Sequence, residues 1–65
     1  AVAIEVKAKR QLASRDFRGL RAIDGLEGMT RRIVVFLGDR PFVTEDRIDA
    51  LPVAEFVREL ERRQV

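Results

Sequence analysis

The sequence predicts a small α/β domain, in which a mixed and mostly parallel sheet carries two helices. Three patterns predict it: an alternating apolar stretch at residues 1–8, a helical pattern after it, and a continuous apolar run over residues 33–37. A strand, a helix and a second strand within about 37 residues form one βαβ unit, whose two strands run parallel. The 65 residues are therefore expected to form a single domain with a thin core.

The first predicted element is a strand at residues 1–8. Its apolar side chains recur at every second position, which places them on one face: Val2, Ile4 and Val6. Glu5 and Lys7 then share the opposite face of the strand, because successive side chains alternate.

A helix is predicted between Ser14 and Gly25, since Ser is a favourable N-cap residue and Gly commonly follows a helix end. Its inward face is formed by apolar residues at spacings of three and four: Phe17, Leu20 and Ile23. Gly19 costs about 1 kcal/mol inside a helix, so close packing against a neighbouring strand is expected there.

The second half of the chain predicts three strands and a final helix. Residues 32–37 are a β-rich apolar run, which is typical of a strand covered on both faces. Turns at residues 38–41 and 45–46 separate it from short strands at 42–44 and 47–50. Pro52 suits the first position of a helix. The apolar stripe of that helix is expected to be Val53, Phe56, Val57 and Leu60.

Such a sheet is short of strands, because parallel sheets are normally covered on both faces and contain more strands than this chain supplies. The chain also opens at Ala1 inside a strand-like stretch, as expected of a segment cut from a longer protein. We therefore expect homo-oligomerisation through exposed strand edges.

The composition excludes several classes of protein. The chain has no Cys, His, Trp or Tyr, which excludes disulfides, zinc fingers, His-dependent triads and aromatic platforms that stack bases. The longest apolar run is far shorter than the roughly 20 residues that span a bilayer, and no signal peptide is recognisable. A cytoplasmic protein without membrane contact is expected.

Charge is distributed unevenly over a net +2. Residues 1–32 hold eight basic and four acidic groups, whereas residues 33–65 hold five basic and seven acidic groups. Any contact with nucleic acid is therefore expected on the first half, through the outward face of the first helix and the cations before it. Those candidate residues are Lys7, Lys9, Arg10, Arg15, Arg18 and Arg21. A solvated helix exterior would show the same charges.

The sharpest local motif is Glu5-Val6-Lys7 at the end of the first strand. A carboxylate there suits Mg²⁺, and an ammonium two residues on could orient a water or stabilise a phosphate undergoing cleavage. The pattern is common, so a weak surface pair on an edge strand is the alternative interpretation. Two further acidic or turn-forming stretches, at residues 38–41 and 45–49, are interpreted as surface turns.

The order and spacing of four segments resemble the C-terminal domain of a large family of AAA+ ATPases of bacteria and archaea, a nuclease-like domain of the PD-(D/E)XK type. The segments are IEVKAKR, SRDFRGLRAI, RRIVVFLGDRPF and IDALPVAEFVREL, which cover nearly the whole chain. The resemblance implies that residues 1–65 are the C-terminal half of such a domain, a β-α-β-β-α fragment of a restriction-endonuclease-like sheet.

By this resemblance, Glu5 matches the second metal-binding acid and Lys7 the catalytic lysine. The family's other metal-binding Asp lies on a preceding hairpin, and no residue here corresponds to it. Mg²⁺ is expected only if a second carboxylate is supplied, so this chain alone is not expected to cleave nucleic acid. No G-x-x-x-x-G-K-[ST] motif is present, so the ATPase module is absent.

The sequence therefore leads to one main hypothesis and two alternatives. The main one is a non-catalytic nuclease-like module of an AAA+ ATPase, serving assembly or non-specific nucleic-acid contact, with the ATPase region as a further partner. The first alternative is a fragment of a Mg²⁺-dependent nuclease site at Glu5 and Lys7. The second is an uncharacterised protein-interaction domain.

Overall fold

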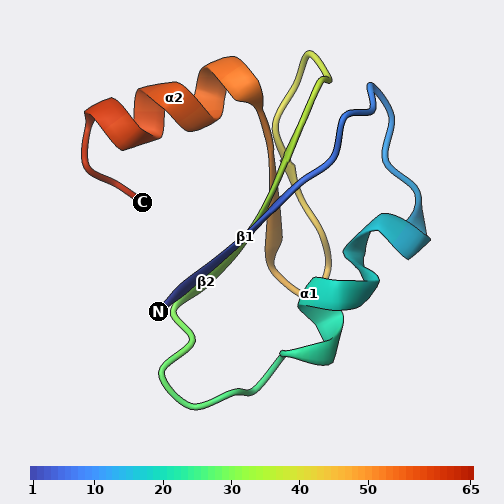
Figure 1. The fold of residues 1–65 in the computed structure, drawn as a ribbon, viewed down its shortest axis with the longest axis vertical. Coiled ribbons are helices and arrows are strands. Elements are labelled where there is room, and N and C mark those ends of the chain that lie inside the picture. Colours follow the sequence, from blue (N-terminus) through green and yellow to red (C-terminus); the bar gives the residue numbers. More distant parts are fainter.

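The fold has the predicted α/β class and the predicted order of elements (Figure 1). The computed structural model describes all of residues 1–65. In chain order its elements are β1 (Val2–Val6), the 3₁₀ turn η1 (Ser14–Phe17), α1 (Arg18–Ala22), β2 (Arg31–Phe36), β3 (Phe42–Val43), β4 (Ile48–Pro52) and α2 (Val53–Glu61).

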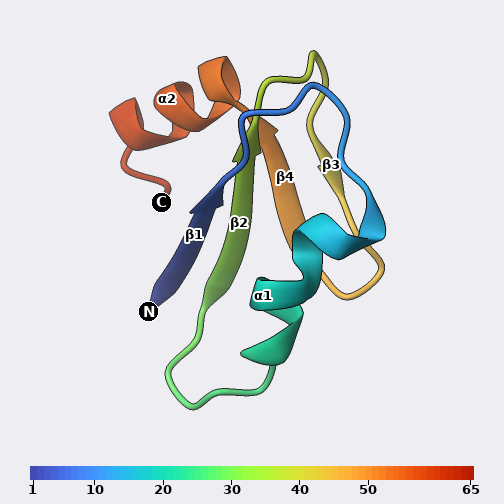
Figure 2. The same cartoon turned by 45° about the vertical axis from the view of Figure 1, so that its right-hand side comes forward.

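The four strands form one mixed sheet in the order β1-β2-β4-β3 (Figure 2). β1, β2 and β4 run parallel, and β3 is antiparallel to β4. β2 and β4 are therefore the central strands, whereas β1 and β3 each have one open edge. The two helical segments lie on opposite faces of the sheet, which explains why residues 33–36 of β2 are all apolar.

The face under η1 and α1 carries the larger core cluster. Phe17 and Leu20 pack there against side chains of β2 and β4, as the helical spacing predicts. The strand residues of this cluster are Val34, Phe36, Ile48 and Ala50. Arg32 is buried on the same face and donates to the carbonyl oxygen of Leu20 at 3.1 Å.

The face under α2 carries a smaller cluster. Ile33, Val35 and Leu51 are buried there, and the partly buried Phe56 of α2 packs on them. An ion triad fixes the helix to the sheet: Arg31 donates to Asp49 at 2.6 Å and to Glu59 at 3.1 Å. These hydrogen bonds raise the pKa of the Arg31 guanidinium, with the contact to Asp49 as the largest cause.

The start of the first helix differs from the prediction. The cap position is Ala13 rather than Ser14, and the first turn is a 3₁₀ helix. The Asp16 carboxylate accepts the Ala13 N–H at 2.7 Å, so Asp16 supplies the capping oxygen from inside the turn. The Ser14 hydroxyl accepts instead from Arg21 at 3.0 Å.

Candidate functional site

Glu5 and Lys7 lie together on the face of β1 that points toward α1. The Lys7 ammonium is 3.8 Å from the Glu5 carboxylate, and about two thirds of each side chain is buried. The carboxylate lies over Gly19, where a Cβ would sit 3.6 Å from both of its oxygens. That distance is ordinary van der Waals contact with a side chain, so the packing at Gly19 does not itself require a glycine. One Glu5 oxygen, Oε2, is fully buried and has no hydrogen-bond partner.

A second ion pair lies just beyond β1. Lys9 donates to both oxygens of Asp16 at 3.0 Å, and the Asp16 side chain is almost completely buried. The pKa of this carboxyl is lowered, first by the Ala13 N–H and then by the Lys9 ammonium. Through these contacts with Lys9 and Ala13, Asp16 connects the segment after β1 to η1.

These carboxylates do not make a complete magnesium site. No three Asp, Glu, His or Cys side chains come together anywhere in the chain. Near the end of β1, only Glu5 has a carboxylate oxygen without a hydrogen-bond partner, because both Asp16 oxygens accept from Lys9. Mg²⁺ sheds its waters reluctantly and is held poorly by a single carboxylate. The residues present therefore do not fit the metal by themselves.

The cations predicted to contact nucleic acid are divided into paired and free groups. Four of the six form ion pairs within the chain: Lys7 with Glu5, Lys9 with Asp16, Arg10 with Asp39 at 3.5 Å, and Arg21 with Asp46 at 3.0 Å. Arg15 and Arg18 are exposed and have no acidic partner. The structure therefore leaves two free guanidinium groups on the helix, where the sequence suggested a continuous basic face.

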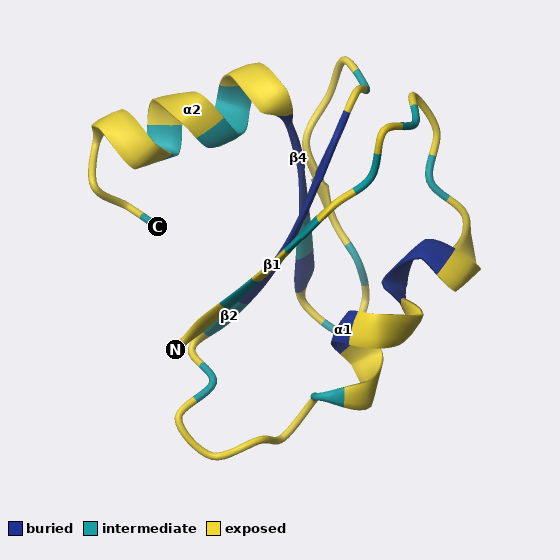
Figure 3. Cartoon of the chain, in the orientation of Figure 1, coloured by how far each residue is buried: buried dark blue, intermediate teal, exposed yellow.

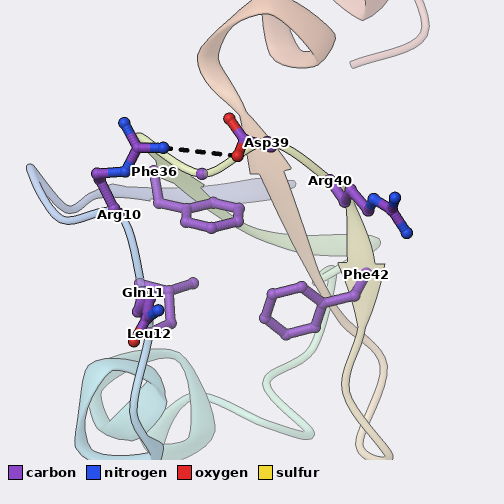
Figure 4. A pocket seen from close by; sticks show the side chains of 8 residues that line it. Arg10, Gln11, Leu12, Phe36, Asp39, Arg40 and Phe42 are labelled. Carbon is purple, nitrogen blue, oxygen red and sulfur yellow. Dashed lines mark hydrogen bonds and ion pairs between the residues drawn. The ribbon is translucent and has the colours of Figure 1, made fainter.

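A cavity of about 400 Å³ lies at the carboxyl end of β2 (Figure 4). Phe36 and Phe42 meet there edge to face, with ring centroids 5.9 Å apart, and Leu12 lies on the opposite side. The pair of Arg10 and Asp39 lies at the rim. No pattern in the sequence predicts this cavity, and residues 38–41 are interpreted there only as a turn. In the structure, a Cβ on Gly38 would overlap the Phe36 ring.

An uncovered apolar feature lies on β1 itself. We call Val2, Ile4 and Val6 the β1 strip. Their exposed fractions are 38%, 45% and 72%, and Figure 3 shows β1 as mostly exposed beside the buried β2. The strip shares its face of the sheet with α2, because Ile4 is in register with Ile33 and Val6 with Val35. Three apolar residues of α2 are also exposed: Val53, Val57 and Leu60.

The sequence predicted the composition of the β1 strip but not its exposure. Alternation identifies an apolar face, and it does not reveal whether a helix covers that face. α2 packs on β2 and β4 and leaves β1 open. The predicted apolar stripe of α2 is likewise only partly used, since Phe56 alone of its four residues packs on the core cluster.

Comparison with known proteins finds no matching family model, no curated relative and no similar solved structure. Neither helix is long and apolar enough to cross a membrane. The fold and its surfaces define a small α/β domain with an open, apolar edge strand.

Proposed function

We propose that this chain is a non-catalytic assembly module, the nuclease-like C-terminal part of a cytoplasmic AAA+ ATPase of prokaryotes. The observation that carries the assembly role is the β1 strip, where an edge strand presents three apolar side chains to solvent. Unpaired edges of this kind pair readily with another chain, and proteins normally cover or charge them. Assembly through β1 would supply the missing neighbour.

Catalysis receives less support than assembly. Glu5 and Lys7 have the spacing of the nuclease half-motif, but they pair with one another and no second carboxylate joins them. The buried and unpartnered oxygen of Glu5 is the one feature that favours a cation. Completion of that site requires a carboxylate from outside this chain.

Nucleic-acid contact also receives less support. A polyanion would have to compete with Glu5, Asp16, Asp39 and Asp46 for four of the six candidate cations. Of these six, only Arg15 and Arg18 are free to neutralise phosphates without breaking an ion pair. Two phosphate contacts give weak binding that is lost at moderate salt.

Sedimentation with two matched variants tests the assembly role. Val6 and Val43 are both exposed valines on edge strands, at opposite edges of the sheet. We expect the unmodified chain and Val43→Lys to gain mass with concentration and Val6→Lys to stay monomeric. At about 1 mM even an association of about 4 kcal/mol is half formed. A monomeric chain at that concentration, or one that binds duplex DNA as a monomer in about 50 mM salt, would overturn the proposal.

A further inference from the structure

The main-chain groups of β1 point alternately toward β2 and toward the open edge. The carbonyl oxygen of Ala1 accepts the Thr30 N–H at 2.7 Å, and the Lys7 N–H donates to Val35 at 2.8 Å. Odd-numbered residues of β1 therefore face β2. Because the direction alternates along a strand, the even-numbered residues direct their N–H and C=O groups to the open edge. Those residues are Val2, Ile4 and Val6.

The same three residues thus carry both features of the open edge. Their side chains form the β1 strip, and their main-chain groups are the free donors and acceptors. A strand that satisfies the free main-chain groups would also place its own side chains beside the strip. The partner of this edge is therefore expected to be a strand that is itself apolar at alternate positions.

We infer that this partner is β1 of a second copy of the chain, paired antiparallel about a two-fold axis that passes through Ile4. This inference rests on the assembly role proposed above and specifies its partner. Ile4 is the middle residue of the five in β1, so this register pairs the whole strand with itself. Val2 then lies opposite Val6 of the second copy, and Ile4 lies opposite Ile4 of the second copy. These opposed even-numbered residues exchange both main-chain hydrogen bonds, which gives about six bonds across the axis.

Charge disfavours the register centred on Glu5, one of the two nearest alternatives. A shift that centres the pairing on Glu5 places the two Glu5 carboxylates directly opposite one another, which is destabilising. A register centred on Val6 requires the strand to continue past Lys7, but the chain bends there, with the Lys9 N–H donating to the Lys7 carbonyl oxygen. The register centred on Ile4 places Glu5 opposite Ala3 and avoids both problems.

The resulting dimer joins two four-stranded sheets into one sheet of eight strands. The axis is perpendicular to the sheet, so both copies of α2 lie on one face and both copies of α1 on the other. The two β1 strips then form one continuous apolar surface between the α2 helices. Each β1 gains a neighbour, and two edges of the unassociated chains are removed.

An NMR experiment tests this register. In a mixture of ¹³C-labelled and unlabelled chain, we expect an intermolecular NOE between the Hα atoms of Ala3 and of Glu5 of the second copy. These residues form a non-hydrogen-bonded pair, whose Cα atoms lie about 4.5 Å apart. NOEs between copies within β1 that pair other residues would overturn the register and leave assembly through β1 standing, whereas NOEs only at β3 or α2 would overturn both. A chain that stays monomeric would overturn both.

Two substitutions at Ile4 provide a second test. Ile4→Pro removes an N–H that points to solvent in the single chain, so edge-strand geometry tolerates it. Ile4→Val keeps the N–H and most of the side chain. We expect the Pro variant to retain the amide spectrum of β2 and to lose self-association by about tenfold or more, the equivalent of about 1.4 kcal/mol. The Val variant should associate nearly as well as the unmodified chain. Equal association of the Pro and Val variants would contradict the register.

Discussion

Ile4 of β1 and Ile33 of β2 are in register on the same face of the sheet, yet Ile33 is completely buried and Ile4 is 45% exposed. The two side chains are chemically identical and belong to adjacent strands, so the difference comes from what lies above them. α2 covers β2 and stops short of β1. The open position of Ile4 is the basis of the assembly role.

The first prediction compares these two residues in the unassociated chain. Ile33→Ala removes a buried side chain from the core under α2 and should lower the free energy of unfolding by about 3 kcal/mol. Ile4→Ala should cost less than about 1 kcal/mol, because much of that side chain is already in water. Urea unfolding at micromolar concentration measures both. Similar losses at the two positions would show that β1 is covered in the single chain.

The second prediction concerns Gly38 beside the cavity. Gly38→Ala places a methyl group where the Phe36 ring lies, so the ring must move or the turn must shift. Overpacking of this kind costs about 1–3 kcal/mol. The neighbouring exposed substitution Asp39→Ala removes only the surface pair with Arg10 and should cost less than about 1 kcal/mol. Unfolding curves and the aromatic NMR shifts of Phe36 distinguish the two variants.

The third prediction concerns the ion triad that fixes α2. Arg31→Ala leaves Asp49 and Glu59 without their shared cation, and all three side chains are at least three-quarters buried. Loss of one partner from such a network costs about 3 kcal/mol. Arg58→Ala breaks only an exposed pair with Glu55 and should cost less than about 0.5 kcal/mol. Equal stability of the two variants in urea unfolding would mean that the triad does not hold the helix.

The fourth prediction concerns acid. Contacts lower the pKa of two carboxyls: Asp16, through the Ala13 N–H and Lys9, and Asp46, through the Thr44 hydroxyl and Arg21. Each folded-state pKa lies below the unfolded value of about 3.9, so their stabilisation is complete above about pH 5 and is lost as the pH falls through the folded pKa. Asp16→Asn should lower the free energy of unfolding at pH 7, and this free energy should then decrease less between pH 5 and pH 3 than in the unmodified chain. If urea unfolding shows the same decrease for both, the assignment to Asp16 is contradicted.

The sequence predicts the elements well because each is encoded by nearby residues. Alternation marks β1, spacings of three and four place Phe17 and Leu20 in the core, and the apolar run marks β2 as a buried strand. The prediction of Ser14 as the cap was wrong, because the turn begins one residue earlier, where the Ala13 N–H donates to the Asp16 carboxylate. That contact is accompanied by the pairing of Asp16 with Lys9, a residue outside the helix.

The candidate site is less predictable, because its features depend on contacts between distant segments. Arg10 with Asp39 and Arg21 with Asp46 are pairs more than twenty residues apart, and they change which cations are free. The sequence allows Glu5 and Lys7 to pair on one face of the strand, but it does not reveal that the carboxylate lies over Gly19. The exposure of Ile4 depends on which strands α2 covers, and no local pattern in the sequence predicts this.

Amide hydrogen exchange at Ile4 as a function of concentration tests the assembly role most directly. The Lys7 amide donates to Val35 within the chain and serves as the internal control. At micromolar concentration the Ile4 amide should exchange rapidly and the Lys7 amide slowly. Near 1 mM the Ile4 amide should become protected by about tenfold or more, with little change at Lys7. Rapid exchange of the Ile4 amide at every concentration would contradict pairing of β1 with a second chain.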